Sequence, residues 1–357
     1  MMPQLRPRLV SSVRGGLRAI SSVPISRRAI DKLARELALA VSESSATQAG
    51  PPGDADGTPS ATARARWHTT SSAPPLLAAG EPALPQLNRL CALEDWQLPA
   101  FRQAVRRLLP YFVENFPDFP ERREHRKHWE FAHTALGLAQ LGAIHDNATV
   151  LAVGAGHEEI SYDLSTRARW VFVTDIYGSG RFSGIEGDAR MLLDLDHFAR
   201  CAYNRNRLVV QYMTGVDLRF ESDTFDAAYS LSSIEHFGGL EAAIGALKEM
   251  HRVVKPGGIV AITTECVVNG APQYSVPGLE LFSSQNLCHL VTAVPGLIPV
   301  EDLDLSLSEA TRASRLLPLR RTRAEAALAH EVYPHILLEH EGRVYTSVAI
   351  FWRKAGA

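Results

Sequence analysis

The stretch Val150-Leu-Ala-Val-Gly154-Ala-Gly156-His157-Glu158 decides the fold. Its four apolar residues indicate a short buried strand, and a Gly-x-Gly turn leads from this strand into a helix predicted over 158–167. Glycine has no Cβ, so a ligand can approach the backbone closely at such a turn. The start of the following helix adds free N–H groups. The alternative is a tight strand–helix turn without a ligand.

The turn lacks the third glycine of the dinucleotide pattern Gly-x-Gly-x-x-Gly, because Glu159 stands at that position. A carboxylate at the start of a helix repels the pyrophosphate that this pattern normally holds. The turn therefore favours a nucleoside ligand without phosphates. It argues against an NAD-dependent oxidoreductase, which is one enzyme class that a Gly-x-Gly turn after a buried strand would otherwise suggest.

Short apolar runs alternate with amphipathic helices after this turn. Apolar runs of this kind, separated by helices, predict an α/β fold with a doubly wound, mostly parallel sheet covered on both faces. We expect strands at 149–153, 170–174, 208–212, 225–231 and 259–264, and helices at 158–167, 189–202 and 240–254.

Two helices, about 96–114 and 125–142, are predicted ahead of the sheet. Beyond it we expect a helix to about 293, strands at 298–305 and 344–353 with 335–340 pairing beside the second, and an Arg-rich helical insertion at about 308–329. The predicted organisation is a disordered basic tail and linker over 1–85 with a short helix at 29–41, a helical lead-in over 86–147 and one domain over 148–357, with a substrate-side insertion at about 306–330.

Two further motifs follow the glycine turn in order. They are Leu218-x-Phe-x-x-x-x-Phe225-Asp226, which leads into the fourth strand, and Glu249-x-x-Arg-Val-Val-Lys-Pro-Gly-Gly258, which leads into the fifth. With these motifs the chain resembles the class I S-adenosylmethionine-dependent methyltransferases, with a methyltransferase type 11-like domain. The resemblance covers about 127–270 well and 271–357 loosely. It implies a Rossmann-like, seven-stranded sheet and S-adenosyl-L-methionine as cofactor.

The resemblance also implies roles for individual residues. Asp175, 19 residues after Gly156, would accept hydrogen bonds from the ribose hydroxyls, unless it merely caps a strand. The implied cofactor-binding residues are Gly154, Ala155, Gly156, Asp175, Met213, Thr214, Asp217 and Ser230. Two positions depart from the family pattern: Ala152 stands where an acid is common in the first strand, and Thr214 replaces the acid that meets the adenine, which leaves Asp217 or main chain as a substitute.

The catalytic candidates are His236 and Glu235, which follow the fourth strand at the sheet edge where ligands bind. His236 is the better base because imidazole titrates near neutral pH; the alternative is that both residues only cap the next helix. Glu265 after the fifth strand is placed similarly. On the helix at 125–142, Lys127, Trp129 and Glu130 would close over the cofactor, with Trp129 either a lid or a core residue.

The acceptor of the methyl group is predicted to be a small molecule or a glycan-type compound. Five arginines at 312–323 form either a solvated helical face or the approach for an anionic acceptor. Aromatic and basic residues do not alternate, so nucleic acid is not expected. A module that keeps the fold but has lost catalysis is the second candidate, motivated by Ala152 and Thr214.

No metal site is predicted. His125 and His128 lack a third ligand and are interpreted as solvated helix residues. The four cysteines form no CxxC pair, which favours a reduced compartment and a cytoplasmic location. The apolar runs are too short for a membrane span.

Charge is unevenly distributed although the chain's net charge is only −2. Residues 1–80 hold 10 basic and 5 acidic residues, so this part carries +5 and the remainder −7. The Arg- and Ser-rich start is typical either of an organellar transit peptide or of a disordered basic extension. The near-neutral total excludes a uniformly basic nucleic-acid binder.

Overall fold

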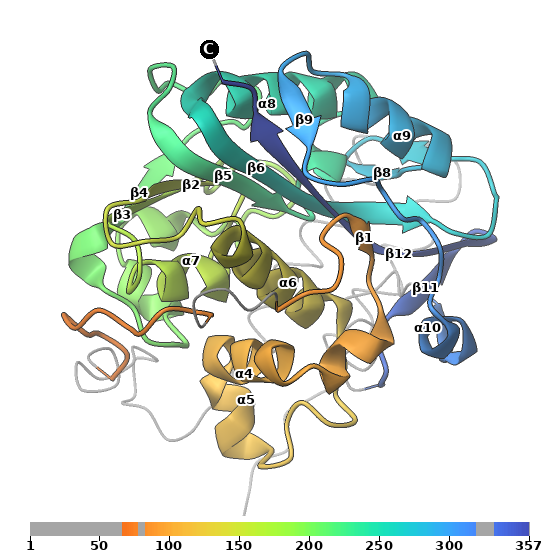
Figure 1. Ribbon diagram of the computed structural model, residues 1–357, viewed down its shortest axis with the longest axis horizontal. Coiled ribbons are helices and arrows are strands. Elements are labelled where there is room, and N and C mark those ends of the chain that lie inside the picture. Colours follow the sequence, from red (N-terminus) through yellow and green to blue (C-terminus); the bar gives the residue numbers. More distant parts are fainter. Residues whose placement is uncertain (1–65, 78–82, 319–331, 357) are drawn as a thin grey trace, which may run out of the picture. The chain divides into compact units, whose positions relative to one another are not determined.

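The computed structural model describes residues 66–77, 83–318 and 332–356 (Figure 1). By its internal contacts the chain divides into two units, 1–60 and 61–357. The predicted helix at 29–41 lies outside the described residues, as do Arg320, Arg321 and Arg323. The description below concerns the second unit.

A central sheet, with ten strands among the described residues, is the framework of the second unit. Five strands run parallel in the order β4-β3-β2-β5-β6, so the order reverses direction between β2 and β5. These strands are β2 (Thr149–Val153), β3 (Trp170–Asp175), β4 (Leu208–Tyr212), β5 (Phe225–Leu231) and β6 (Val254–Val267). The predicted doubly wound parallel sheet is confirmed.

An antiparallel strand, β12 (Arg343–Lys354), continues the sheet beyond β6. Its outer edge pairs with β9 (Leu297–Pro299), β11 (Leu337–His340) and β1 (Arg89–Leu90), and β10 (Leu316–Pro318) pairs with β11. The seven expected strands are therefore present, and three short ones extend them. The expected pairing of 335–340 beside the last strand is confirmed by β11.

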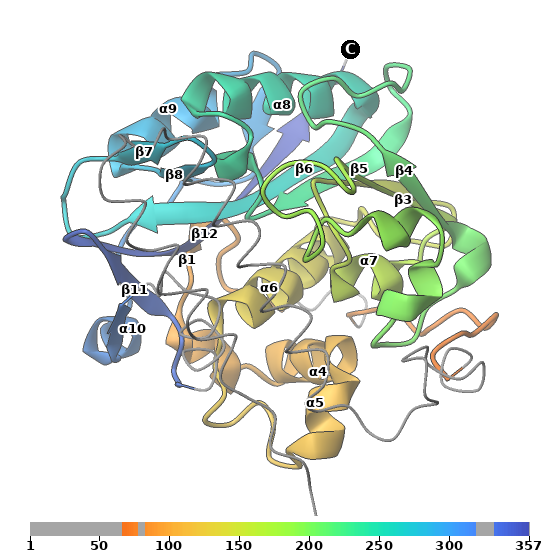
Figure 2. The ribbon, with the colours of Figure 1, turned by 180° about the vertical axis from the view of Figure 1, so that it is seen from behind.

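Helices cover both faces of the sheet (Figures 1 and 2). One face carries α4 (Pro99–Leu108), α6 (Arg126–Gln140) and α7 (Glu159–Leu164), and the other carries α8 (Leu240–Val253) and α9 (Ser284–Thr292). Strand β2 serves both layers because its side chains alternate. Val150 and Ala152 pack in the first core, and Leu151 and Val153 in the second.

Two predicted helices are broken by residues that cannot continue them. The helix expected at 96–114 is divided into α4 and α5 (Pro110–Asn115), because proline at 110 has no N–H to donate to the preceding turn. The helix expected at 189–202 is wrong. Two 3-10 turns, Ala189–Leu192 and Leu195–Phe198, replace it, separated by non-helical Asp194 (φ −146°). Leu193 is 86% exposed, so the segment has no continuous apolar face.

The region after α9 also differs from expectation. The strand expected at 298–305 is limited to β9, which ends at Pro299. The Arg-rich helix expected at 308–329 is only α10 (Glu309–Ala313) in the described part, because Ser314 is extended and β10 follows. Arginine residues 312 and 315 therefore do not belong to one long helical face.

Part of the predicted linker contacts the domain. Thr69 N–H donates to the Tyr203 carbonyl at 2.8 Å, and Tyr203 N–H donates to the Trp67 carbonyl at 3.0 Å. Ala73 N–H donates to the Thr166 carbonyl at 3.0 Å. Residues 66–77 thus belong to the second unit and are hydrogen-bonded to the rest of it, although the sequence predicts a linker here. Within the described residues no helix is both long and apolar enough to cross a bilayer.

Candidate active site

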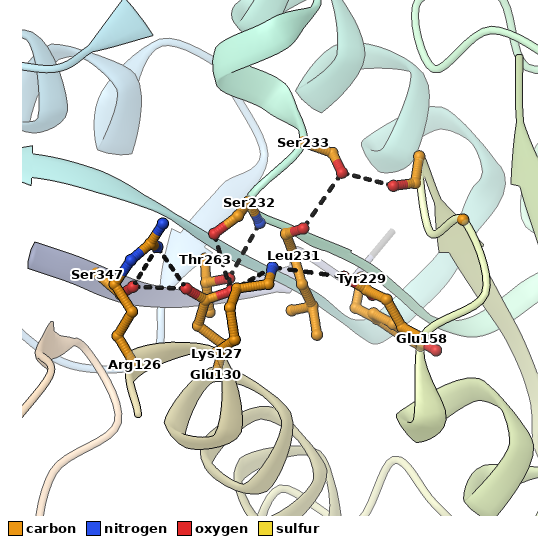
Figure 3. Close-up of polar contacts among 12 residues, drawn as sticks. Arg126, Lys127, Glu130, Glu158, Tyr229, Leu231, Ser232, Ser233, Thr263 and Ser347 are labelled. Carbon is orange, nitrogen blue, oxygen red and sulfur yellow. Dashed lines mark hydrogen bonds and ion pairs between the residues drawn. The ribbon is translucent and has the colours of Figure 1, made fainter. Parts of the chain in front are cut away.

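The candidate site lies at the carboxyl ends of the parallel strands, between β2 and β5, where the strand order reverses. In an open α/β sheet this reversal leaves a crevice between the loops, which is the usual ligand site. Three polar groups of residues meet there: the loop after β2, the turn after β5 and the start of α6. Figure 3 shows the α6 side chains directed toward the turn after β5.

The loop after β2 needs its two glycines. Gly154 and Gly156 have φ values of +63° and +48°, a region that side chains disfavour. A Cβ on Gly156 would lie 2.5 Å from the Glu186 carbonyl oxygen, and one on Gly154 would lie 2.9 Å from Ser233 Cβ. The Ser233 hydroxyl donates to the Gly154 carbonyl. The loop is therefore held against the turn after β5, and its backbone is open to close approach.

Asp175 ends β3 beside this loop. Its Oδ2 accepts the Gly156 N–H at 2.8 Å, and its Oδ1 accepts the Ile176 N–H at 2.6 Å. Burial raises the pKa of Asp175, and these two N–H groups partly offset the effect. Each oxygen keeps acceptor capacity for a second donor. The carboxylate is thus fixed next to Gly156, where the sequence predicts the ribose hydroxyls.

Residues after β4 are divided between the interior and the surface. Met213 is buried, and its N–H donates to the Asp175 carbonyl at 2.9 Å. Thr214 follows it and accepts the Asp217 N–H at its carbonyl. The Asp217 side chain is 63% exposed and lies 3.5 Å from Arg219. Of the two acidic residues expected to bind cofactor, only Asp175 is joined to the glycine loop.

The turn after β5 contributes hydroxyl groups. Ser230 is fully buried, and its Oγ has no hydrogen-bond partner among the described residues. Ser232 Oγ donates to Glu130 Oε2 at 2.8 Å. Ala155 in the facing loop is also buried and donates its N–H to the Thr174 carbonyl. The serine turn and the glycine loop therefore enclose the crevice between β2 and β5.

Glu130 of α6 is the centre of a charged cluster (Figure 3). This carboxylate is fully buried, yet it lies 3.0 Å from Arg126 Nη1 and 2.8 Å from Lys127 Nζ. It also accepts hydroxyl hydrogens from Ser232 and Ser347. Arg126 in turn lies 2.8 Å from Glu265 Oε1. A buried charge is tolerated when it is paired and hydrogen-bonded in this way.

Glu235 and Glu265 form a buried carboxyl pair, with exposures of 0% and 4%. Glu235 Oε1 and Glu265 Oε2 have no partner if both groups are ionised. Burial, and then the charge of Glu265, raises the pKa of Glu235 well above its ordinary value. Burial alone would also raise the pKa of Glu265, but Arg126 and a hydrogen bond from Glu235 lower it to about 2. Protonated Glu235 therefore donates to ionised Glu265.

His236 adjoins this pair. Its Nδ1 lies 2.8 Å from the Gly278 carbonyl oxygen, which only accepts, so Nδ1 carries the hydrogen and Nε2 a lone pair. Nε2 lies 4.0 Å from Glu235 Oε1, and the ring packs against Phe182 at 4.6 Å. Burial lowers the pKa of His236, and Arg181 and Lys127 also act in this direction. The imidazole is therefore neutral at pH 7.

Two interpretations of α6 and its flank are settled by burial. Trp129 is a core residue and not a lid: it is fully buried, and its indole N–H donates to Asp95 at 2.7 Å. The prediction of solvated histidines is wrong, because His125 and His128 are both buried. His125 stacks on His335, and His128 lies against Phe112 and Phe119. His335, distant in sequence, thus covers His125, and its carbonyl accepts the Arg126 N–H at 2.9 Å.

Comparison with known proteins agrees with this geometry. Residues 151–262 match the family model described as a methyltransferase domain. This segment is a class I S-adenosylmethionine-dependent methyltransferase domain. It spans the glycine loop, Asp175, the serine turn and His236, and its cofactor is S-adenosylmethionine.

Several solved structures are similar to this chain. A putative sarcosine dimethylglycine methyltransferase from Galdieria sulphuraria is 15% identical, with 71% of this chain and 98% of that chain covered and a TM-score of 0.43. The [4+2]-cyclase SpnF is 16% identical, with coverages of 78% and 90% and a TM-score of 0.42. A putative methyltransferase from Bacillus halodurans is 13% identical, with coverages of 62% and 98% and a TM-score of 0.40. At these TM-scores they add nothing to the family assignment.

The described residues of this domain fit S-adenosylmethionine. The glycine loop leaves backbone exposed beside a fixed carboxylate, as a nucleoside requires. Ser230 Oγ and Glu158 Oε2 are buried polar atoms without a partner in the described part of the chain. Such atoms cost free energy until a ligand satisfies them. They lie at the ends of β5 and β2, on the two sides of the crevice.

The charged cluster is the part of the site that sequence reasoning found only in fragments. Glu130 meets Ser232 and Thr263, which are 102 and 133 positions away. One sequence feature pointed to it: Arg126, Lys127 and Glu130 lie close together at the start of a helix that has no further Asp, Glu, Lys or Arg up to Gln140. Glu158 carried no predicted role of its own.

Proposed function

We propose that this methyltransferase domain is catalytically active and transfers a methyl group from S-adenosylmethionine to a small-molecule or glycan-type acceptor. The cofactor supplies a methyl group already activated on a sulfonium. The protein then has to align the acceptor and, for a hydroxyl acceptor, to remove its proton. The observation that carries the proposal is the hydrogen bond between His236 Nδ1 and Gly278, which leaves Nε2 as a base.

His236 suits the role of base for two physical reasons. It is neutral at pH 7, so it can accept a proton without first losing one. Its Nε2 lies 4.0 Å from a carboxyl pair that holds one proton and one negative charge, and this charge stabilises the imidazolium formed during transfer. Glu235 is fully buried, so it acts through His236 as a positioning residue and not on the acceptor.

We further propose an acceptor that carries a negative charge. Arg181 donates to the Gly278 carbonyl at 3.3 Å, and His236 contacts the same carbonyl. The positive charge of Lys127 also acts on the imidazole of His236 and lowers its pKa. A carboxylate, phosphate or acidic sugar would be attracted to these cations. The cations that support an anionic acceptor are thus Arg181 and Lys127 at the edge of the sheet. The five arginines at 312–323 carry no part of this proposal, because only two of them belong to the described residues.

The test measures release of S-adenosylhomocysteine by the full chain in the presence of S-adenosylmethionine and paired acceptors, such as a hydroxylated carboxylic acid or a uronic acid and its neutral methyl ester. We expect turnover with the acid and at least tenfold less with the ester. Calorimetry should detect binding of S-adenosylhomocysteine and no binding of NAD. Cofactor binding without turnover across the panel would favour a non-catalytic module, and binding of NAD alone an oxidoreductase.

A further inference from the structure

Glu158 is an acidic residue of the glycine loop that the proposed chemistry does not use. It lies two residues after Gly156 and closes the turn by donating its N–H to the Ala155 carbonyl at 3.1 Å. Its side chain is 15% exposed. Oε1 lies 3.6 Å from Lys127 Nζ, whereas Oε2 is buried and has no hydrogen-bond partner in the described part of the chain. The carboxylate therefore has one oxygen available for a donor at the crevice.

Lys127 has the complementary property. Its ammonium has three N–H donors. Two are accounted for by Glu130 Oε2 at 2.8 Å and Glu158 Oε1 at 3.6 Å, and the side chain is 30% exposed. One donor can thus meet a ligand while the Glu130 contact holds the lysine in place. Figure 3 shows Lys127 between Glu130 and Glu158.

A cation and an adjacent carboxyl group, both with spare hydrogen-bonding capacity, match a zwitterion, whose ammonium group favours ionisation of the carboxyl group. We propose that Glu158 and Lys127 bind the α-amino-acid end of the cofactor, with Glu158 Oε2 accepting from its ammonium group and Lys127 Nζ donating to its carboxylate. The inference rests on the S-adenosylmethionine function. It gives the cofactor a direction, because Asp175 at the end of β3 takes the ribose and Glu158 lies toward β5.

Proton balance offers a signature of this contact. Burial raises the pKa of Glu158 to about 8, which Lys127 lessens and the neighbouring carboxylates increase. At pH 7 the free protein therefore holds a proton on Glu158. An ammonium group against Oε2 favours the ionised form. Binding of the amino-acid end should then release a proton from Glu158 to the buffer.

The test compares two ligands of the full chain by calorimetry at pH 7. S-adenosylhomocysteine has the amino-acid end, and 5′-methylthioadenosine keeps the nucleoside thioether but lacks that end. Glu158→Gln and Lys127→Met should each weaken S-adenosylhomocysteine binding by about 10- to 100-fold, the range for a lost charge-assisted hydrogen bond. Both variants should bind methylthioadenosine as the unchanged protein does, which also shows that they fold.

Glu159→Gln is the matched control, because it removes the same kind of carboxyl group from the neighbouring residue, whose largest charge interaction is with Arg200 and only a smaller one with Lys127. It should leave both affinities within about twofold. Titrations in buffers of different ionisation enthalpy should detect proton release with S-adenosylhomocysteine and none in Glu158→Gln. Equal weakening of both ligands by Glu158→Gln, or of neither, overturns the inference. Failure of the unchanged protein to bind either ligand would instead remove the proposed function.

Should Lys127→Met bind neither ligand because Glu130 is left unpaired, Lys127→Arg provides the second variant. It keeps the charge beside Glu130 and replaces the ammonium by a longer, planar group. We expect it to bind methylthioadenosine normally and to bind S-adenosylhomocysteine more weakly than the unchanged protein. Normal binding of both ligands by this variant, together with normal binding by Glu158→Gln, would also contradict the inference.

Discussion

Arg126 Nη1 lies 2.8 Å from Glu265 Oε1, and this contact joins the start of α6 to β6 at the edge of the site. The same Nη1 lies 3.0 Å from Glu130 Oε1, so one guanidinium serves two buried carboxylates. Glu265 also takes the hydrogen bond of protonated Glu235. The helix that carries Lys127 is thereby tied to the turn that carries His236, through charges that are almost completely buried.

This pairing predicts an asymmetry between two glutamates. Glu265→Gln should lower the free energy of unfolding by about 3–5 kcal/mol, because the buried Arg126 then keeps only Glu130, a carboxylate that it shares with Lys127. Glu235→Gln should change it by less than about 1 kcal/mol, because glutamine resembles the protonated acid and can still donate to Glu265. Urea unfolding at pH 7 measures both values. Equal losses in the two variants would contradict the assignment of the proton to Glu235.

The pair also predicts how stability depends on pH. The pKa of Glu265 is lowered to about 2 in the folded protein, so its contribution is present above the unfolded value near 4.5 and is lost as pH falls toward 2. Glu235 has the opposite sign: its raised pKa gives stability that is present below 4.5 and declines as pH rises toward the folded pKa. In Glu235→Gln the decline on the alkaline side should be smaller, as thermal unfolding between pH 5 and 9 can measure.

Asp175 is the residue on which binding of the nucleoside should depend most. Asp175→Ala removes the acceptor beside Gly156, and we expect it to weaken S-adenosylhomocysteine binding by about 2–3 kcal/mol, the scale of hydrogen bonds to a charged group. Asp217→Ala is the comparison. Its carboxylate is mostly exposed and pairs with Arg219, so affinity should change by less than about 0.5 kcal/mol. A larger loss of affinity in Asp217→Ala than in Asp175→Ala would show that the nucleoside binds beside Asp217, and it would contradict the assignment of Asp175 to the ribose.

The parallel strands were predictable because both of their faces are buried. In β2 and β5 every residue after the first or second is apolar or small, and the predicted bounds of both strands are confirmed. The helix at 189–202 and the long Arg-rich helix were not predictable, because each needed a continuous apolar face and Leu193 or Ser314 interrupts it. Local composition resembled a helix in both cases, but the described residues of these two segments offer no continuous apolar face for packing.

The site divides in the same way. The glycine loop, Asp175 and His236 were found because local motifs place them at strand ends. The Glu130 cluster was not found as a unit, since its partners on β6, β12 and the serine turn come together only through the strand order. The burial of His125 likewise involves His335, which stacks on its ring from more than 200 positions away.

Truncation of the N-terminus can test the prediction of a disordered tail and linker over 1–85, because residues 66–77 contact the rest of the domain. The predicted disordered tail and linker over 1–85 imply that a chain beginning near Gly80 folds normally. Such a chain loses the hydrogen bonds of Thr69 and Ala73 to the rest of the domain. At about 1 kcal/mol for each such bond, we expect a loss of 1–3 kcal/mol in the free energy of unfolding. A chain beginning at Ala61 keeps these contacts and should unfold at the temperature of the full chain. Equal melting temperatures for both truncated chains would show that residues 66–77 add nothing to stability.

His236 provides the sharpest test of catalysis. His236→Ala should lower kcat by about 10²- to 10⁴-fold, the range for a positioned general base, with little change in cofactor affinity. Because burial lowers the pKa of His236, the rate of the unchanged protein should rise with pH through a pKa below that of free imidazole, which is near 6.5, and level off above this pKa. The variant should lose this limb of the profile.

The matched control is His251→Ala on α8, a histidine whose pKa burial also lowers and which lies beside Gly296, away from the serine turn. It should keep kcat and the rising limb, since no proton passes through it. Glu235→Gln should keep most of the rate, because Glu235 is already protonated and only positions the imidazole. If His236→Ala retains near-normal turnover and the same pH profile, His236 is a structural residue, and ionised Glu265, beside Arg126, becomes the next base to replace.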